Sequence, residues 1–165
     1  GNDAAVAIAE YISGDVDSFA ALMNQEAAAM GATRSHFVNP NGLPDENHYT
    51  CVYDMYLIFS NAIKNDTFVS IIGTTSYDVT YTDASGEAVT HTWENTNQYL
   101  TGNATTPDGF QIVGGKTGTT GEAGYCLVLY SYNPSGQPII SIVFKADGKS
   151  NLYLLMNEML QGFAI

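Results

Sequence analysis

The stretch GGKTGTTGEAGYCL, residues 114–127, is the most informative part of the chain because it leads from a glycine-rich segment into an apolar one. Its K-T-G triplet is weak by itself, since residue frequencies produce it in roughly a few per cent of chains of this length. The simplest interpretation is a glycine-rich turn before a strand. The functional interpretation is a strand edge that offers a ligand carboxylate the cation of Lys116, the hydroxyl of Thr117 and the bare backbone of Gly118. Only a residue without Cβ lets a substrate backbone lie that close.

A phosphate-binding loop is the first competing explanation, because its pattern G-x-x-x-x-G-K-[ST] also ends in G-K-T. The first glycine of that pattern would have to be residue 110, which is Phe110. A helix should also follow the lysine, whereas residues 125–132 have the apolar, aromatic composition of a strand. The sequence therefore disfavours a phosphate-binding loop.

The segments around this stretch predict antiparallel strands. Residues 113–119, 125–132 and 139–144 read as strands, and Asn133–Gly136 supplies the turn between the last two. Upstream, residues 77–81 and 89–93 alternate apolar and polar side chains across a turn at 83–86. Such alternation predicts a hairpin that buries one face.

Helical patterns lie on both sides of these strands, which predicts an α+β fold: an antiparallel sheet flanked by helices. Several caps are candidates: Asn2 or Asp3 for the first helix, Asp15 or Asp17 for the second, and Thr50 for the third. The expected helices run through 4–9 to a stop at Gly14, from 15 or 17 to near Gly31, from 52 through 59, over 67–72, and from about 150 to 161.

Composition excludes some classes of function. The length of 165 residues fits one domain, and no apolar run is long enough for a transmembrane helix. Net charge is −12, and the basic residues are scattered, so nucleic-acid binding is not expected. These basic residues are Arg34, Lys64, Lys116, Lys145 and Lys149.

No cofactor or metal is expected, because the cysteines and histidines lack metal-ligand spacing. Cys51 and Cys126 form no C-x-x-C pair and are expected to be buried free thiols. Of the histidines, His48 is expected to order the loop before the third helix, and His36 and His91 to be structural or exposed.

Four motifs in order give the chain its resemblance to a family. It resembles the serine-type D-alanyl-D-alanine carboxypeptidases, the low-molecular-weight penicillin-binding proteins of the peptidase S11 family, which share the β-lactamase/transpeptidase-like fold. The motifs are FVNPNGL at 37–43, similar to FxNPxGL; HYT at 48–50 with Asp54-Met55, similar to HxS/T…DM; NTNQYL at 95–100, similar to NTNxLL; and GKTGTT at 115–120 with AGYC at 123–126, similar to GxKTGxT…AGxC.

The chain departs from the family in two motifs. The S-x-N motif is represented by Asn2 alone, since its serine would precede Gly1. S-x-x-K is absent, because no serine has a lysine three residues later, and Lys64 comes one place too late after Ser60. Residues 1–165 are therefore expected to be the C-terminal portion of one penicillin-binding domain. The N-terminal strands and the nucleophile helix are missing, and the isolated chain is expected to be inactive.

The resemblance implies acyl transfer to a serine on peptidoglycan stem peptides that end in D-Ala-D-Ala, with β-lactam antibiotics as inhibitors, outside the cytoplasm. It implies that Asn2 binds the substrate carbonyl and the missing lysine, and that Lys116 polarises a proton relay. Thr117 would bind the terminal carboxylate beside Gly118, and the backbone N–H of Thr119 would serve the oxyanion hole.

Three further expectations remain open to test. No arginine lies in or near the last helix, so Lys145 and Lys149 are the nearest cations for the substrate carboxylate. Either the chain associates with the missing N-terminal segment, or its unpaired strand and uncovered face drive self-association. The alternative function is a non-catalytic peptidoglycan-binding or structural module with the same fold.

Overall fold

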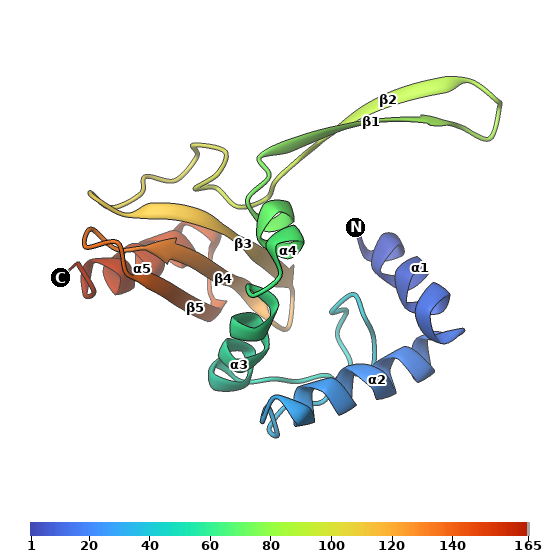
Figure 1. The fold of residues 1–165 in the computed structure, drawn as a ribbon, viewed down its shortest axis with the longest axis horizontal. Coiled ribbons are helices and arrows are strands. Elements are labelled where there is room, and N and C mark those ends of the chain that lie inside the picture. The colour runs from blue at the N-terminus through green and yellow to red at the C-terminus, as the bar shows by residue number, and fades with distance from the viewer. Residues whose placement is uncertain (165) are drawn as a thin grey trace.

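The computed structural model describes residues 1–164 and has the predicted α+β architecture (Figure 1). An antiparallel sheet of three strands lies between helices, and a separate two-stranded hairpin extends from it. The elements are α1 (Asn2–Ser13), α2 (Val16–Ala29), α3 (Val52–Ala62), α4 (Asp66–Ile72), β1 (Ser76–Thr82), β2 (Ala88–Glu94), β3 (Gln111–Thr120), β4 (Gly124–Tyr132), β5 (Pro138–Ala146) and α5 (Lys149–Gln161).

The central strand β4 joins the two cores of the sheet because its side chains alternate between the faces. The strand order is β3-β4-β5. On one face, Leu127 and Leu129 pack with Met156 and Leu160 of α5, and all four are fully buried. On the other face, Val128 packs in a second cluster with residues of α3, α4 and β5. The position of β3 is therefore set by a strand buried on both sides.

Helix α4 approaches β3 backbone to backbone. A Cβ added at Gly114 would lie 2.5 Å from the carbonyl oxygen of Ile72, and one added at Gly73 would lie 2.7 Å from that of Val113. Neither glycine can gain a side chain without moving the helix or the strand. Gly114, which precedes the K-T-G triplet, is therefore required for the close packing of β3 against α4. The sequence pattern did not reveal this role.

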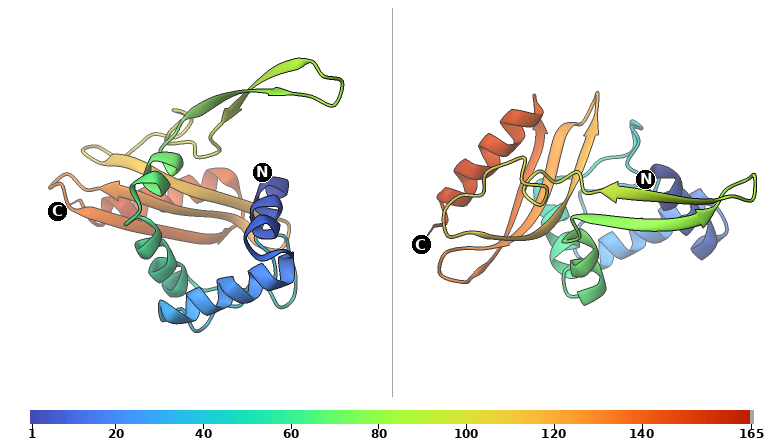
Figure 2. Two further views of the ribbon diagram at one scale, coloured as in Figure 1. Left: turned by 45° about the vertical axis from the view of Figure 1, so that its right-hand side comes forward. Right: turned by 90° about the horizontal axis from the view of Figure 1, so that it is seen from above.

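Helices α1 and α2 lie beside the sheet, and the loop 30–51 connects α2 to α3 (Figure 2). Asp54 of α3, which is 1% exposed, organises this loop. Its carboxylate accepts hydrogen bonds from the Arg34 N–H at 2.7 Å and the Ser35 hydroxyl at 2.8 Å. Burial alone would raise the pKa of Asp54. These two hydrogen bonds, a further one from Cys51 and the positive charge of Arg34 outweigh burial, so the pKa is lowered.

Two of the three predicted helix caps are wrong. Asp15 does cap α2, since its carboxylate accepts from the Ser18 N–H at 2.8 Å. Gly1 rather than Asn2 or Asp3 precedes α1, whose first turn has no side-chain cap. Cys51 precedes α3, because the Thr50 hydroxyl is used elsewhere: it lies 2.7 Å from the Ser35 hydroxyl, in the loop network around Asp54.

The β1–β2 hairpin forms as predicted, but it is not half-buried. It projects away from the three-stranded sheet (Figures 1 and 2). Tyr77 is 61% exposed and Trp93 is 54% exposed, while Val79 and Val89 are only partly covered. Alternation indicated a face that could be buried, but the sequence pattern cannot identify a covering element, and none of the described elements packs extensively on the hairpin.

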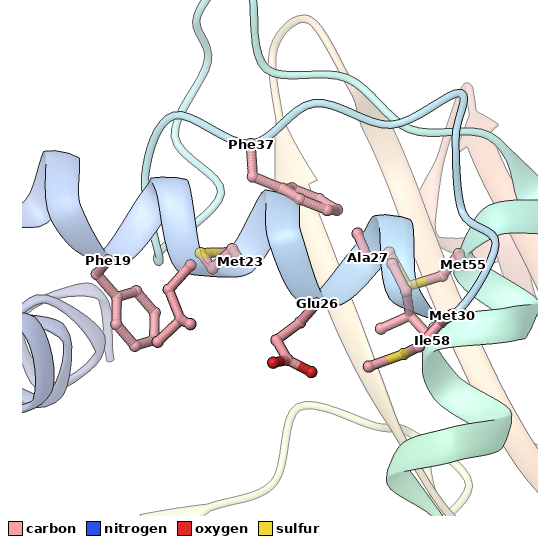
Figure 3. Close-up of a pocket in the computed structure, with 9 residues that line it drawn as sticks. Phe19, Met23, Glu26, Ala27, Met30, Phe37, Met55 and Ile58 are labelled. Carbon is pink, nitrogen blue, oxygen red and sulfur yellow. The ribbon is translucent and has the colours of Figure 1, made fainter.

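Two features of the described residues remain uncovered: one edge of the three-stranded sheet and one apolar cavity. Strand β5 pairs only with β4 within residues 1–164, so its outer edge has no strand partner there. An apolar cavity of about 380 Å³ lies between α2 and α3 (Figure 3). Phe19, Met23, Phe37, Met55 and Ile58 are among the side chains that line it.

Some properties of the described residues bear on the other expectations. Cys51 and Cys126 are free thiols as predicted, but both are partly exposed rather than buried. No helix within residues 1–164 has the length and apolar character needed to cross a membrane. In the same part of the chain, no three His, Cys, Asp or Glu side chains gather into a possible metal site.

His48 orders the loop before α3, as expected. Its Nδ1 accepts a hydrogen bond from the Val38 N–H at 3.1 Å, and its ring lies edge-on to Phe37 at 5.5 Å between centroids. Acceptance by Nδ1 requires the neutral ring. Burial lowers the pKa of His48, although Asp45 raises it in part.

We expect the melting temperature to fall on mild acidification because of His48. A histidine with a lowered pKa in the folded state stabilises the fold above its unfolded pKa of about 6.5, and this contribution is lost as pH falls through the folded value. His48→Gln retains an acceptor but does not titrate, so its melting temperature should decline less between neutral pH and about 5. Differential scanning calorimetry measures this, with His91→Gln on the exposed hairpin as the control. Equal declines for wild type and His48→Gln would contradict the assignment.

Candidate active site

The K-T-G triplet lies on β3, at a side of the sheet that no described strand covers. β3 pairs with β4, where Lys116 faces Val128 and Thr117 faces Leu127. Lys116, Gly118 and Thr119 are exposed, and Thr117 is partly exposed. A Cβ added at Gly118 would meet no atom within 4 Å. An extended ligand can therefore reach the backbone of this strand, because Gly118 leaves open space above it.

Lys116 supplies an available positive charge at this edge. Its ammonium donates a hydrogen bond to the Thr117 carbonyl oxygen. No carboxylate of residues 1–164 lies within ion-pair distance of it; the one ion pair in that range joins Arg34 to Asp54. Although part of the side chain is exposed, neighbouring atoms exclude enough water to lower the pKa of Lys116. A cation with a lowered pKa can attract an anion and also give up a proton more readily.

The segment 95–100, which follows the hairpin, contacts the K-T-G strand β3. The Thr96 hydroxyl lies 2.5 Å from the Thr117 hydroxyl, so one donates to the other. Asn95 holds the base of the segment by donating to the Thr74 carbonyl at 2.8 Å, and its side-chain oxygen accepts from the Asn97 N–H. The sequence singled out this motif by its resemblance, and the structure shows that it positions Thr117.

The same segment is tied to α5 across the end of the sheet. The Tyr153 hydroxyl accepts from the Gln98 N–H at 2.8 Å, and the Tyr99 hydroxyl donates to Asn157 at 2.6 Å. Burial, with a smaller contribution from Tyr153, raises the pKa of Tyr99, so its hydroxyl stays protonated and keeps donating. Reasoning from sequence missed this clamp, because its partners lie far apart along the chain.

Asn2 is not brought into contact with the K-T-G strand. It is exposed in the first turn of α1, and no hydrogen bond joins it to β3 in the part of the chain that the structure describes. Helix α1 packs against α2, and the pair lies beside the sheet (Figure 2). The structure therefore assembles Lys116, Thr117, Gly118 and Thr119 on one strand and leaves Asn2 on a separate element.

A hollow of about 690 Å³ lies at the end of β3. Thr119, Tyr125 and Lys145 are among its lining residues. Lys145 has a φ of 58°, a left-handed backbone that residues other than glycine rarely adopt, where the β4–β5 register shifts. Of the two lysines that the sequence named as nearest cations, Lys145 lines the same hollow as Thr119, while Lys149 begins α5.

Solved structures share this fold. A DD-transpeptidase from Streptomyces, solved as a single-residue mutant, superposes with a TM-score of 0.88 at 30% identity, covering 100% of this chain and 64% of that chain. The fold and the K-T-G strand edge place the chain in the class of the DD-peptidases.

Sequence relatives identify the family. Residues 1–148 match the Peptidase S11 family, described as D-alanyl-D-alanine carboxypeptidase. The chain is 35% identical over 161 residues to the D-alanyl-D-alanine carboxypeptidase DacF of Bacillus subtilis, covering 97% of this chain and 38% of that protein. It is 32% identical over 176 residues to a D-alanyl-D-alanine carboxypeptidase of Streptomyces sp., covering 100% of this chain and 57% of that protein. The chain belongs to the S11 D-alanyl-D-alanine carboxypeptidase family, and it spans between a third and two thirds of the length of these relatives.

Proposed function

We propose that this chain forms one wall of the active site of a serine D-Ala-D-Ala carboxypeptidase that acts on peptidoglycan stem peptides. The observation that carries the proposal is the open edge of β3. There the ammonium of Lys116, which has no ion-pair partner among residues 1–164, is followed by the hydroxyl of Thr117 and the bare backbone of Gly118. A D-Ala-D-Ala terminus is an extended peptide that ends in a carboxylate. The edge can pair with its backbone, as strand addition does elsewhere, while the cation attracts its charge.

Each residue of the edge has a distinct proposed role. The Thr117 hydroxyl donates to the terminal carboxylate, and the Thr96 hydroxyl beside it, 2.5 Å away, would then be the donor of the bond that joins the two threonines. Lys116 provides positive potential and polarises the proton relay to the leaving amine. The Thr119 N–H is one donor of the oxyanion hole. Gly118 leaves room for the substrate backbone.

Asn2 completes the proposed site from the opposite side. Its amide would bind the substrate carbonyl and the lysine of S-x-x-K. Because Asn2 begins a helix that does not pack extensively on β3 among the described residues, this role needs a further element that links α1 to the sheet. The same family chemistry makes β-lactams acylating inhibitors and places the enzyme outside the cytoplasm, where peptidoglycan lies.

The proposed partner of this chain is the N-terminal segment of the same domain, which supplies the serine nucleophile. The free edge of β5 can accept a strand, and the apolar cavity between α2 and α3 can accept a helix face. The isolated 165-residue chain should therefore self-associate or copurify with that segment. Light scattering coupled to size-exclusion chromatography, with mass spectrometry of the peak, measures this. A cooperative monomer that does not bind a hydrophobic dye would contradict the expectation.

The proposed function is tested at Thr117 in the complete protein. Thr117→Val keeps the shape but removes the hydroxyl, so hydrolysis of peptides with a free terminal carboxylate should fall by roughly tenfold to a hundredfold, the scale of one lost charged hydrogen bond. Thr117→Ser keeps the hydroxyl and is the matched control. Steady-state kinetics on a D-Ala-D-Ala peptide and on its terminal amide separate the two effects. Equal losses on both substrates would refute the carboxylate role.

A further inference from the structure

The β1–β2 hairpin presents a largely exposed aromatic face on which no described element packs extensively. In its antiparallel register Tyr77 faces Trp93, and because side chains alternate, residues two apart share a face. Trp93 is 54% exposed, and His91 packs edge-on to it at 6.0 Å between ring centroids. The full face consists of Tyr77, Val79, Tyr81, Val89, His91 and Trp93.

The opposite face of the hairpin is polar and satisfies its own hydrogen bonds. The hydroxyls of Thr80 and Thr90 lie 2.9 Å apart, and the Thr92 hydroxyl donates to Asp78 at 2.6 Å. A two-faced hairpin of this kind normally packs its apolar face on a core. Here the face is exposed and contiguous, which marks an interaction site.

Charge and size restrict what can bind there. Residues 76–94 contain Asp78, Asp83, Glu87 and Glu94 but no lysine or arginine, which disfavours anionic lipid surfaces and nucleic acids. Seven-residue strands give a face about 24 Å long and about 10 Å wide. That is a few hundred Å² at most, below the roughly 800 Å² per partner of a stable protein interface. A narrow, extended and uncharged ligand fits better than a second copy of the chain.

The root of the hairpin is continuous with the proposed site. The Asn95 N–H donates to the Thr75 carbonyl at 2.8 Å where the two strands leave the body, and the next residue, Thr96, contacts Thr117. A ligand seated on the hairpin would therefore extend from the K-T-G edge. The stem peptide of peptidoglycan is covalently attached to a strand of amino sugars, whose rings have apolar C–H faces that stack on aromatic side chains.

We propose that the aromatic face of the hairpin binds the glycan strand of peptidoglycan and holds it while the stem peptide lies along β3. The inference rests on the proposed function for the identity of the polymer. Tyr77 and Trp93 would stack on sugar rings, as rigid rings that lose little conformational freedom when they bind.

The test is calorimetric titration of the complete protein with chito-oligosaccharides, which contain amino sugars but no peptide. Binding should be measurable for the wild type and about tenfold weaker for Tyr77→Ala and for Trp93→Ala. Thr90→Ala, on the polar face, should bind within about twofold of the wild type. Because Trp93 is the single tryptophan of residues 1–165, quenching of its fluorescence in this chain gives a second readout.

Kinetics separate this inference from the proposed function. With a small soluble D-Ala-D-Ala peptide, Trp93→Ala should behave as wild type, whereas with glycan-linked stem peptides its KM should rise about tenfold. If the small peptide is hydrolysed but no chito-oligosaccharide binds, the glycan site is refuted while the enzyme proposal stands. If no peptide is hydrolysed, the enzyme proposal fails and the titration still decides on sugar binding. Loss of vesicle binding or of dimerisation in Trp93→Ala, without sugar binding, would also overturn the assignment.

Discussion

Replacing Lys116 by alanine in the complete protein should slow acylation by penicillin by roughly two to four orders of magnitude, the range for loss of a proton-transfer or electrostatic partner. The expectation follows from its position: no carboxylate of residues 1–164 neutralises its ammonium, and it directly precedes Thr117 on an open strand edge. Folding should change little, because the side chain is exposed and packs in neither core cluster.

Stopped-flow acylation with a chromogenic β-lactam measures this effect. Lys116→Arg is the matched variant, because arginine retains the charge but does not deprotonate. Lys64→Ala, in the turn between α3 and α4, is a control that removes a cation outside the site. Burial lowers the pKa of Lys116, so as the pH rises this residue should lose its charge earlier than a free lysine does. The acylation rate of the wild type should fall with that loss of charge. Lys116→Arg should not show this alkaline loss. Near-normal acylation of Lys116→Ala would mean that K-T-G here is only a structural segment.

The isolated 165-residue chain should show no covalent labelling by a fluorescent penicillin. Acylation needs an activated serine, and no serine in the chain has a lysine three residues later. Lys116 and Thr117 are present, but their proposed roles are to assist a nucleophile and not to replace it.

Gel fluorescence after incubation with the labelled penicillin gives the answer directly. Coexpression with the upstream segment of the same domain should restore stoichiometric labelling, while coexpression with that segment carrying serine-to-alanine at S-x-x-K should not. Stoichiometric labelling of the chain alone would require a different nucleophile within these residues and would overturn the assignment of roles.

Local pattern was enough to predict the order and type of the elements. Composition and periodicity are properties of neighbouring residues, so the apolar, aromatic composition of 125–132 and the helical spacing of Val52, Met55 and Phe59 identify β4 and α3 without tertiary knowledge. The K-T-G strand was likewise found from its own residues. Its place at a strand edge was the functional interpretation of the same residues, and the structure confirms that β3 is an edge strand among the described strands.

What the sequence could not supply depends on distant partners. The Thr50 hydroxyl turns to Ser35 rather than capping α3, because the Asp54 network draws it there. The bond between Thr96 and Thr117 joins residues from different elements. The left-handed backbone at Lys145 arises at a register shift between two strands, a relation that no single segment encodes.

The central position of β4 has a consequence for how this family can change. Leu127 and Leu129 anchor β4 in the core with α5, whereas the outward side chains of β3 take part in little of that packing. If β3 is the proposed substrate edge, substitutions at Thr119 or Thr120 would alter which ligands are accepted without unfolding the sheet. Evolution could then explore substrate preference on the edge strand while selection for folding acts mainly on its neighbour.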